Sequence, residues 1–260
     1  MFRLLQILFL IFSCSHYPKM NVIENVEKES TTSIPDDTLK LGRSATLSDT
    51  LFIYRSLTTD CYHAIYIDTT HASKQLSWLT DFSFDESDHL GLISHHEYWE
   101  ERDPGSFRKQ HMHGLSKEWL PVHPYKGNYY LYAPSDWGNA GRRILTDSSF
   151  IYWYMDGPTS VPIRNVIKKD RKDYSFEIRN FGSDEFTAVN LTVIDPITQL
   201  TLFEFTDEAE AYRYRLYVPV SHLKHFDLII NHCETQKQRE FQFEKLDINT
   251  LIRKHSIEPR

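Results

Sequence analysis

The chain has little of what catalytic signatures are made from. It holds only 3 Cys and 9 Gly in 260 residues. It has no Walker loop, no dinucleotide-binding fingerprint and no Gly-x-Ser-x-Gly nucleophile motif. It also lacks a long hydrophobic run, because the stretch from Leu4 to Phe12 is far below the roughly 20 residues of a transmembrane helix. The sequence therefore gives no signature of a nucleotide-dependent enzyme, a serine hydrolase or a helical membrane protein, and we expect no cofactor.

Positive charge is also scarce. The chain carries 36 acidic and 29 basic residues, a formal net charge of −7. Binding to nucleic acid depends on cations that neutralise phosphates, so this balance argues against a nucleic-acid partner. It also argues against electrostatic adhesion to anionic lipid, so any membrane attachment needs another source.

Aromatic side chains are plentiful. The chain is 40% hydrophobic, 25% charged and 14% aromatic, with 15 Tyr and 16 Phe. The first two values are those of a folded protein. Tyr and Phe favour pleated, half-buried surfaces, so the composition indicates a β-rich domain.

The first fourteen residues have the layout of an export signal. A short cationic start ends at Arg3, an apolar core follows, and the small residue Ser13 precedes Cys14. This arrangement resembles the bacterial lipoprotein signal that is cut by signal peptidase II. The resemblance implies removal of residues 1–13, acylation of Cys14 with lipid such as palmitate, and anchoring in the cell envelope at the outer membrane. An ordinary cleaved secretion signal and a chance hydrophobic start are the alternatives.

The stretch that follows is polar and irregular. Residues 14–49 have no sustained apolar period, so they cannot bury enough surface to fold alone. We predict a lipidated tether, and the alternative is a partly ordered strap lying on the domain. Two cysteines then remain, Cys61 and Cys233, which either pair or are two buried, small apolar residues. We favour the second interpretation.

Residues 50–260 are predicted to form one β-rich domain. Six runs after residue 173 have apolar residues at alternate positions, which is typical of an antiparallel sandwich or barrel. The runs are Tyr174–Ile178, Val189–Val193, Phe203–Phe205, Tyr212–Val218, Phe226–Ile230 and Phe241–Phe243. We also expect strands at 51–54, 62–67, 119–122, 129–133 and 150–155.

Three segments do not fit this pattern. Residues 76–84 have an ambiguous period that permits a strand or a short helix. The polar segment 85–116 is expected to be mostly loop and to separate two possible sub-sheets. Residues 246–255, with Asp247 able to cap, are predicted to form a short C-terminal helix.

One histidine-rich segment is a candidate metal site. On a strand, His111 and His113 would face the same way, and Glu118 follows shortly after. With Gly105 these residues resemble the first metal motif of the cupins, a family of jelly rolls, which implies a metal held by His111, His113 and Glu118. The cupin motif also has a glycine after its glutamate, and Tyr125 stands at that place. The second cupin motif needs a further histidine, and none lies between His123 and His222. The alternative is a polar loop that holds histidines without a function.

An aromatic cluster is the stronger candidate. Tyr and Trp rings offer flat apolar faces with polar tips, which suits sugars or extended peptides. Most of these rings belong to the core, and two or three are expected to remain exposed as a platform. The candidates are Trp119, Tyr130, Tyr132, Trp137 and Trp153.

The functional prediction is a lipid-anchored binding or accessory protein of the cell envelope. Its partners would be the membrane, through Cys14, and an outer-membrane protein complex, with a glycan or a peptide as ligand. A lipid-anchored hydrolase, either a glycosidase or metal-dependent, is the first alternative, with Asp136 and residues 95–118 as its candidates. A structural envelope protein is the second.

Overall fold

The computed structural model describes residues 51–57, 62–154, 156–180, 183–233 and 235–256. The described residues all belong to one compact unit, residues 45–260. The signal 1–13, Cys14 and the tether 14–49 therefore lie outside the described residues, and what is said of them stays a prediction. Within the described ranges, no helix is long and apolar enough to cross a membrane.

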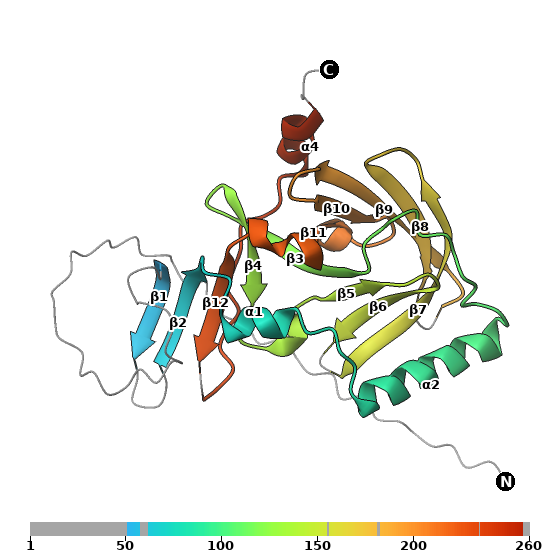
Figure 1. Cartoon of the computed structure of the whole chain (residues 1–260), viewed down its shortest axis with the longest axis horizontal. Helices are drawn as coiled ribbons and strands as arrows, with labels where there is room; N and C mark the ends of the chain where they lie inside the picture. Colours follow the sequence, from blue (N-terminus) through green and yellow to red (C-terminus); the bar gives the residue numbers. More distant parts are fainter. Residues whose placement is uncertain (1–50, 58–61, 155, 181–182, 234, 257–260) are drawn as a thin grey trace, which may run out of the picture. The chain divides into compact units, whose positions relative to one another are not determined.

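Eight antiparallel strands form a closed barrel (Figure 1). They pair in the order β3-β11-β10-β9-β8-β7-β6-β5, and a pairing of β5 with β3 closes the ring. This confirms the prediction of a mainly β, barrel-like fold. The strands are β3 (Glu118–Tyr125), β5 (Arg143–Leu145), β6 (Ser149–Tyr154), β7 (Gly157–Lys168), β8 (Asp173–Arg179), β9 (Phe186–Asp195), β10 (Leu200–Phe205) and β11 (Tyr214–Pro219).

Four more strands continue the sheet from β3, in the order β4, β12, β2 and β1, and we call them the side sheet (Figure 1). The pair β4–β12 is parallel and the other pairs are antiparallel. The sheet joins β1 and β2 to β12, which comes about 160 residues later in the chain. The strands are β1 (Leu51–Leu57), β2 (Tyr62–Asp68), β4 (Asn128–Ala133) and β12 (Leu228–Cys233).

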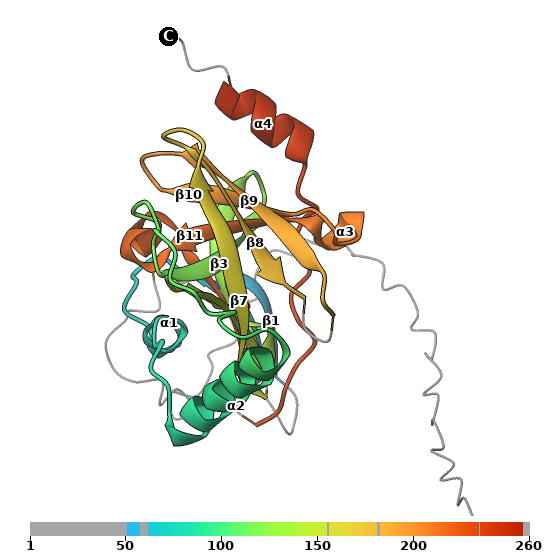
Figure 2. The same cartoon turned by 90° about the vertical axis from the view of Figure 1, so that its right-hand side faces the viewer.

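The helices cover the outside of this sheet. In two views at right angles, α2 and α4 lie at opposite ends of the barrel (Figures 1 and 2). The predicted C-terminal helix is present as α4, and Asp247 accepts from the main-chain N–H of Thr250 at 3.0 Å, as a cap does. The helices are α1 (Lys74–Leu79), α2 (Glu86–Arg102), α3 (Glu210–Arg213) and α4 (Ile248–Ser256), with 3₁₀ turns η2 (Trp137–Asn139) and η3 (Val220–His225).

Alternation along the strands separates an inner core from an outer one. Phe203 and Phe205 on β10 point into the barrel, whereas Leu200 and Leu202 join an apolar cluster on its outside. That outer cluster also holds Leu251 of α4 and apolar residues of β4 and β12. Large rings fill the inside, as expected for a barrel of eight strands. They are Trp119, Phe150, Phe176, Phe203, Phe205 and Tyr217.

The expectation of a loop over residues 85–116 is wrong for its first half. Residues 86–102 form α2, which begins with a capping box between Asp85 and Asp88 and presents Trp99 to the inner core. The prediction failed because α2 has no continuous apolar stripe, and Trp99 is its one fully buried residue among those described. The Asp103-Pro104-Gly105 turn signal marks the end of the helix rather than the middle of a loop.

Two smaller expectations also need correction. Phe241 and Phe243 do not lie on a strand: they belong to an irregular segment packed against the side sheet, where Glu244 N–H donates to the carbonyl of Pro124 at 3.2 Å. Tyr212 lies in α3, so the strand predicted from there starts at Tyr214. In the ambiguous segment 76–84, residues 76–79 are the last part of α1, so the helix alternative holds there.

The cysteine prediction is wrong for Cys233. This residue is disulfide-bonded and only half-buried, whereas we expected a buried, unpaired thiol. Cys233 is the last residue of β12 and is partly exposed to solvent, so it is not one of the small apolar residues of the core. Cys61 lies outside the described residues.

Candidate functional site

An open hollow lies beside α1, and we call it the α1 cleft. It has a volume of about 330 Å³, within the usual range for small-molecule sites. Three elements supply its walls: α1, the end of β4 and the end of β12. The lining residues are Lys74, Gln75, Trp78, Ala133, Pro134, Ser135, Ile230, Asn231, His232 and Cys233.

Helix α1 supplies one wall because of how it is held. Ser73 caps its start by accepting from the N–H of Leu76 at 3.2 Å, and Leu79 is buried in the outer core. Anchoring one face of a short helix in this way turns Lys74 and Trp78, one helical turn apart, toward the cleft. The predicted strand alternative could not have produced this arrangement.

The other walls follow from the parallel pairing of β4 with β12. Leu131 pairs with Leu228 and Ala133 with Ile230, so both strands run in the same direction. Their paired segments end side by side at Ala133 and Ile230. The residues that follow border the cleft: Pro134 and Ser135 after β4, and Asn231 to Cys233 in the last part of β12.

A hydrogen-bond network fixes the floor of the cleft. Asn231 is buried and donates to the hydroxyl of Tyr132 and to the carbonyl of Arg239, both at 3.1 Å. Its side-chain oxygen lies 2.7 Å from Nε2 of His63. Both ends of the amide are thus used within the protein, so Asn231 shapes the floor and does not offer free groups to a ligand.

The carboxylate of Glu240 ties the chain after β12 to the end of β4. It accepts from the hydroxyl of Tyr132 at 2.5 Å, from the N–H groups of Ser135 and Asp136 at 3.2 and 2.8 Å, and from the amide of Asn139 at 3.1 Å. Burial raises the pKa of Tyr132, and the bond to Glu240 raises it further, so the phenol stays protonated and donates. This clamp holds the rim of the cleft in place.

The groups left for a ligand come from α1. Lys74 and Gln75 have no hydrogen-bond or ion-pair partner elsewhere in the described chain, so an ammonium and an amide face the cleft. Beside them, the indole of Trp78 is half-buried and presents an apolar surface. The guanidinium of Arg142 lies 6.0 Å from the centroid of that ring. A flat apolar surface next to hydrogen-bonding groups can bind a polar ring.

The structure does not bring the predicted aromatic residues into one surface. Trp119 is buried in the barrel and donates to the carbonyl of Ser116 at 2.8 Å. Tyr130 and Tyr132 belong to the core of the side sheet, where Tyr132 is buried and Tyr130 is partly so. These three side chains therefore contribute to packing.

The other two aromatic candidates lie elsewhere. Trp153 is half-buried on the outside of the barrel, stacked on Phe84 at 5.1 Å, with the guanidinium of Arg142 at 3.9 Å from its centroid. It helps to hold the segment between α1 and α2 against β6. Trp137 begins η2, and its side chain lies outside what the structure describes.

Two of the three candidate metal ligands lie together, but no three-residue site is formed among the described residues. The rings of His111 and His113 are in edge contact, with centroids 4.4 Å apart, in an irregular segment instead of a strand. Glu118 begins β3. Across the residues that the structure describes, no group of three or more His, Cys, Asp or Glu side chains could hold a metal ion.

The hydrolase candidates are engaged in structural contacts. Lys237 lies 2.8 Å from the carboxylate of Asp136 and, as its main influence, lowers the pKa of that group. An acid held ionised in this way is poorly suited to donate a proton. His95 accepts from the N–H of Ser160 at 3.4 Å, and burial lowers its pKa.

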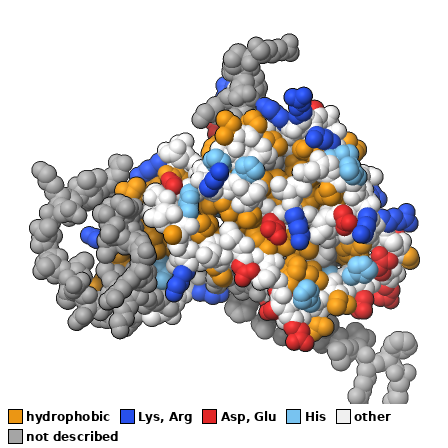
Figure 3. Space-filling model, viewed as in Figure 1, with side chains coloured by type: hydrophobic (Ala, Val, Ile, Leu, Met, Phe, Trp, Pro, Cys, Tyr) orange, Lys and Arg blue, Asp and Glu red, His pale blue; other side chains and the backbone are white. Residues whose placement is uncertain are grey.

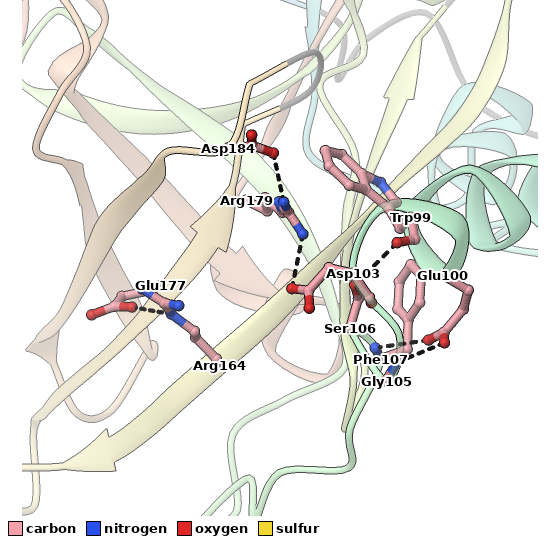
Figure 4. Close-up of polar contacts among 10 residues, drawn as sticks. All are labelled: Trp99, Glu100, Asp103, Gly105, Ser106, Phe107, Arg164, Glu177, Arg179 and Asp184. Atoms are coloured by element: carbon pink, nitrogen blue, oxygen red, sulfur yellow. Dashed lines mark hydrogen bonds and ion pairs between the residues drawn. The ribbon is translucent and has the colours of Figure 1, made fainter.

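A second hollow, of about 560 Å³, lies on the outer face of β7, β8 and β9. Its lining is mostly charged, and its charges are largely paired: Arg164 with Glu177 at 2.5 Å, and Asp184 with the buried Arg179 at 2.7 Å (Figure 4). Arg179 also holds Asp103, at the end of α2, at 2.9 Å. These pairs fasten α2 to the barrel, so we do not favour this hollow as a ligand site.

Sequence reasoning missed the residues of the α1 cleft. Trp78 lies in the segment 76–84, whose period was ambiguous, Lys74 and Gln75 come just before it, and His232 follows the apolar run Phe226–Ile230. The available signal was the Ser73 cap before Leu76 and Leu79, which marks a helix with one buried face. The meeting of β4 with β12, about 100 residues apart, left no local trace. The chain matches no protein-family model, no curated protein and no solved structure.

Proposed function

We propose that this protein is a lipid-anchored binding protein of the bacterial cell envelope, and that the α1 cleft holds one unit of a glycan. The single observation that carries the binding function is the placement of the Trp78 ring next to the uncommitted polar groups of Lys74 and Gln75 in one hollow. Sugar rings have an apolar face and a rim of hydroxyl groups, which matches this arrangement.

Two further features support the envelope setting. The lipoprotein-like signal over residues 1–14 provides an address, and Cys14 would provide the anchor. Cys233 is disulfide-bonded, and disulfides persist mainly in oxidising compartments outside the cytosol. An accessory role beside an outer-membrane complex is compatible with both features.

Glycan-array screening of the mature protein, followed by calorimetry on the hits, tests the binding function. We expect Trp78→Ala and Gln75→Ala to weaken binding at least tenfold, because they remove the stacking surface and a hydrogen-bonding amide. Tyr212→Ala is the matched control, since Tyr212 is an exposed aromatic residue on α3, outside the cleft. Binding that survives Trp78→Ala, or a peptide as the only ligand found, contradicts the proposal.

The predicted lipid anchor on Cys14 has its own test. Mass spectrometry of the native protein should find an acylated cysteine at position 14 as the first residue, and Cys14→Ser should release the protein from membranes. A native chain that still begins at Met1 contradicts the lipid anchor, and it has no bearing on ligand binding in the α1 cleft. The hydrolase alternative has less support, because Asp136 is tied to Lys237 and no group of three or more possible metal ligands is found among the described residues.

A further inference from the structure

The inner face of the barrel carries a buried arginine without an acidic partner. Arg143 on β5 is only 5% exposed. Within the described residues it forms no ion pair, and its one hydrogen bond runs from Nη1 to the carbonyl of Arg142 at 2.8 Å. Its Nε is buried and has no hydrogen-bond partner. A buried cation is costly unless a counter-charge or hydrogen bonds compensate it, so this side chain needs an explanation.

Strand register places Arg143 inside the barrel. It is paired with Trp119 on β3 and with Tyr152 on β6, and residues paired across strands share a face. Trp119 and Tyr152 both pack with the inner core. The guanidinium lies 4.8 Å from the centroid of Tyr152, which compensates part of its charge.

A second arginine faces the same interior. Arg215 on β11 is paired with Phe203, which is buried inside the barrel, and its guanidinium lies 5.3 Å from the centroid of Phe205. It is 31% exposed and is paired with Glu208 at 2.8 Å. Among the described residues, one carboxylate is thus paired with one of the two guanidinium groups, and the other guanidinium has no acidic partner.

Tyrosines complete the surroundings. Burial raises the pKa of Tyr152, whose ring lies 4.8 Å from the guanidinium of Arg143, and the charges of Arg143 and Glu208 also act on this pKa. Tyr154 stacks on Tyr152 with centroids 5.8 Å apart and is 50% exposed. The rings of the inner core fill the barrel interior next to these side chains.

We propose that this end of the barrel is an anion site, in which Arg143 and Arg215 bind a carboxylate or phosphate group. A planar guanidinium with free N–H groups matches the paired oxygens of such anions. The hydroxyls of Tyr152 and Tyr217 are further donors, and the exposed ring of Tyr154 would cover the organic part of the ligand. This site uses none of the residues of the α1 cleft, so it does not depend on the proposed function.

The test is a titration of the mature protein with inorganic phosphate and with acetate, followed by heteronuclear NMR. We expect shifts at residues of β5, β6 and β11, a single saturable site, and at least a tenfold weaker affinity in Arg143→Gln and Arg215→Gln. Arg164→Gln is the control, because Arg164 is an exposed arginine on β7 that is already paired with Glu177. Phosphate and acetate report which of the two anion types is preferred.

A second measurement separates binding from structure. If Arg143 binds an anion, Arg143→Met should abolish the anion-induced NMR shifts. Without anion, this variant should be at least as stable as the wild type, because it removes a poorly compensated buried charge. Failure of both anions to bind the wild type overturns the proposal. So does equal binding by wild type and Arg143→Gln, or a loss of fold in Arg143→Met with binding retained by Arg215→Gln.

Discussion

Trp99 of α2 donates its indole N–H to the main-chain carbonyl of Ser160 on β7, across 3.2 Å. The N–H of Ser160 in turn donates to Nδ1 of His95, at 3.4 Å. Strand β8 pairs only with residues 163–168 of β7, so the first half of β7 has an edge without a strand neighbour. Two side chains of α2 thus form hydrogen bonds with main-chain groups at this edge of β7. Because these groups are already bonded, the edge is protected from pairing with a strand of another molecule.

The first prediction concerns this contact. Trp99→Ala should destabilise the domain by about 4 kcal/mol, because it removes a large side chain from the inner core and leaves the carbonyl of Ser160 without its partner. Trp99→Phe should cost roughly 2 kcal/mol. Urea unfolding measures both. Leu90→Ala on the same helix, where Leu90 is 62% exposed, should change stability by less than about 0.5 kcal/mol.

The Glu240 clamp gives the second prediction. Glu240→Ala leaves the hydroxyl of Tyr132 and the N–H groups of Ser135 and Asp136 without their acceptor, so we expect a loss of about 3 kcal/mol. Limited proteolysis should then cut residues 235–247 more rapidly. Glu244→Gln is the matched control, since Glu244 is exposed and accepts one hydrogen bond, from the N–H of Lys126. Equal proteolysis of the two variants would show that the clamp is dispensable.

The sequence predicted the strands better than their arrangement. Alternation from Tyr174 to Val218 gave β8, β9, β10 and the body of β11, because a strand with one buried face leaves a period of two in the sequence. Helix α2 was missed, because it is buried mainly through Trp99 and through polar bonds to a strand edge. The closure of the ring, in which β3 pairs with β5, has no local signature either.

The sites were less accessible to sequence reasoning than the fold. Composition identified aromatic residues as important, yet it could not tell the buried Trp119 from Trp78, which lines a cavity. Nothing in the sequence around Arg143 marks it as a candidate. Its neighbours Ile144 and Leu145 are both buried, and only the register with Trp119 shows that the arginine faces inward. Function here depends on which strands meet, and that information is not local.

The disulfide of Cys233 leads to the third prediction. Reduction should lower the free energy of unfolding by roughly 2–4 kcal/mol, because a cross-link restricts the unfolded chain. Urea unfolding with and without dithiothreitol measures the difference. Alkylation of the unfolded, unreduced protein should leave Cys233 unlabelled, and Cys233→Ser should remove the effect of the reductant. A Cys233 that reacts fully without reduction would contradict the bond.

The fourth prediction concerns pH. His123 stacks on Phe243 with centroids 4.3 Å apart, and burial lowers its pKa from about 6.5 to about 4. The ring is therefore neutral in the folded protein, while the unfolded chain takes up a proton below about pH 6.5. Stability due to this group is complete above that pH and is lost as the pH falls toward 4. Between about pH 8 and pH 5 we expect a loss on the order of 2 kcal/mol.

Replacement of the ring isolates its contribution to this pH dependence. Comparing urea unfolding at the two pH values, His123→Gln should show a smaller loss than the wild type. Some dependence should remain, because burial also lowers the pKa of His95. His225→Gln is the control, because His225 is exposed at the end of η3 and should leave the wild-type slope unchanged. A wild-type slope in His123→Gln would mean that this histidine is protonated as readily in the folded protein as in the unfolded chain, and that its stacking on Phe243 does not exclude water.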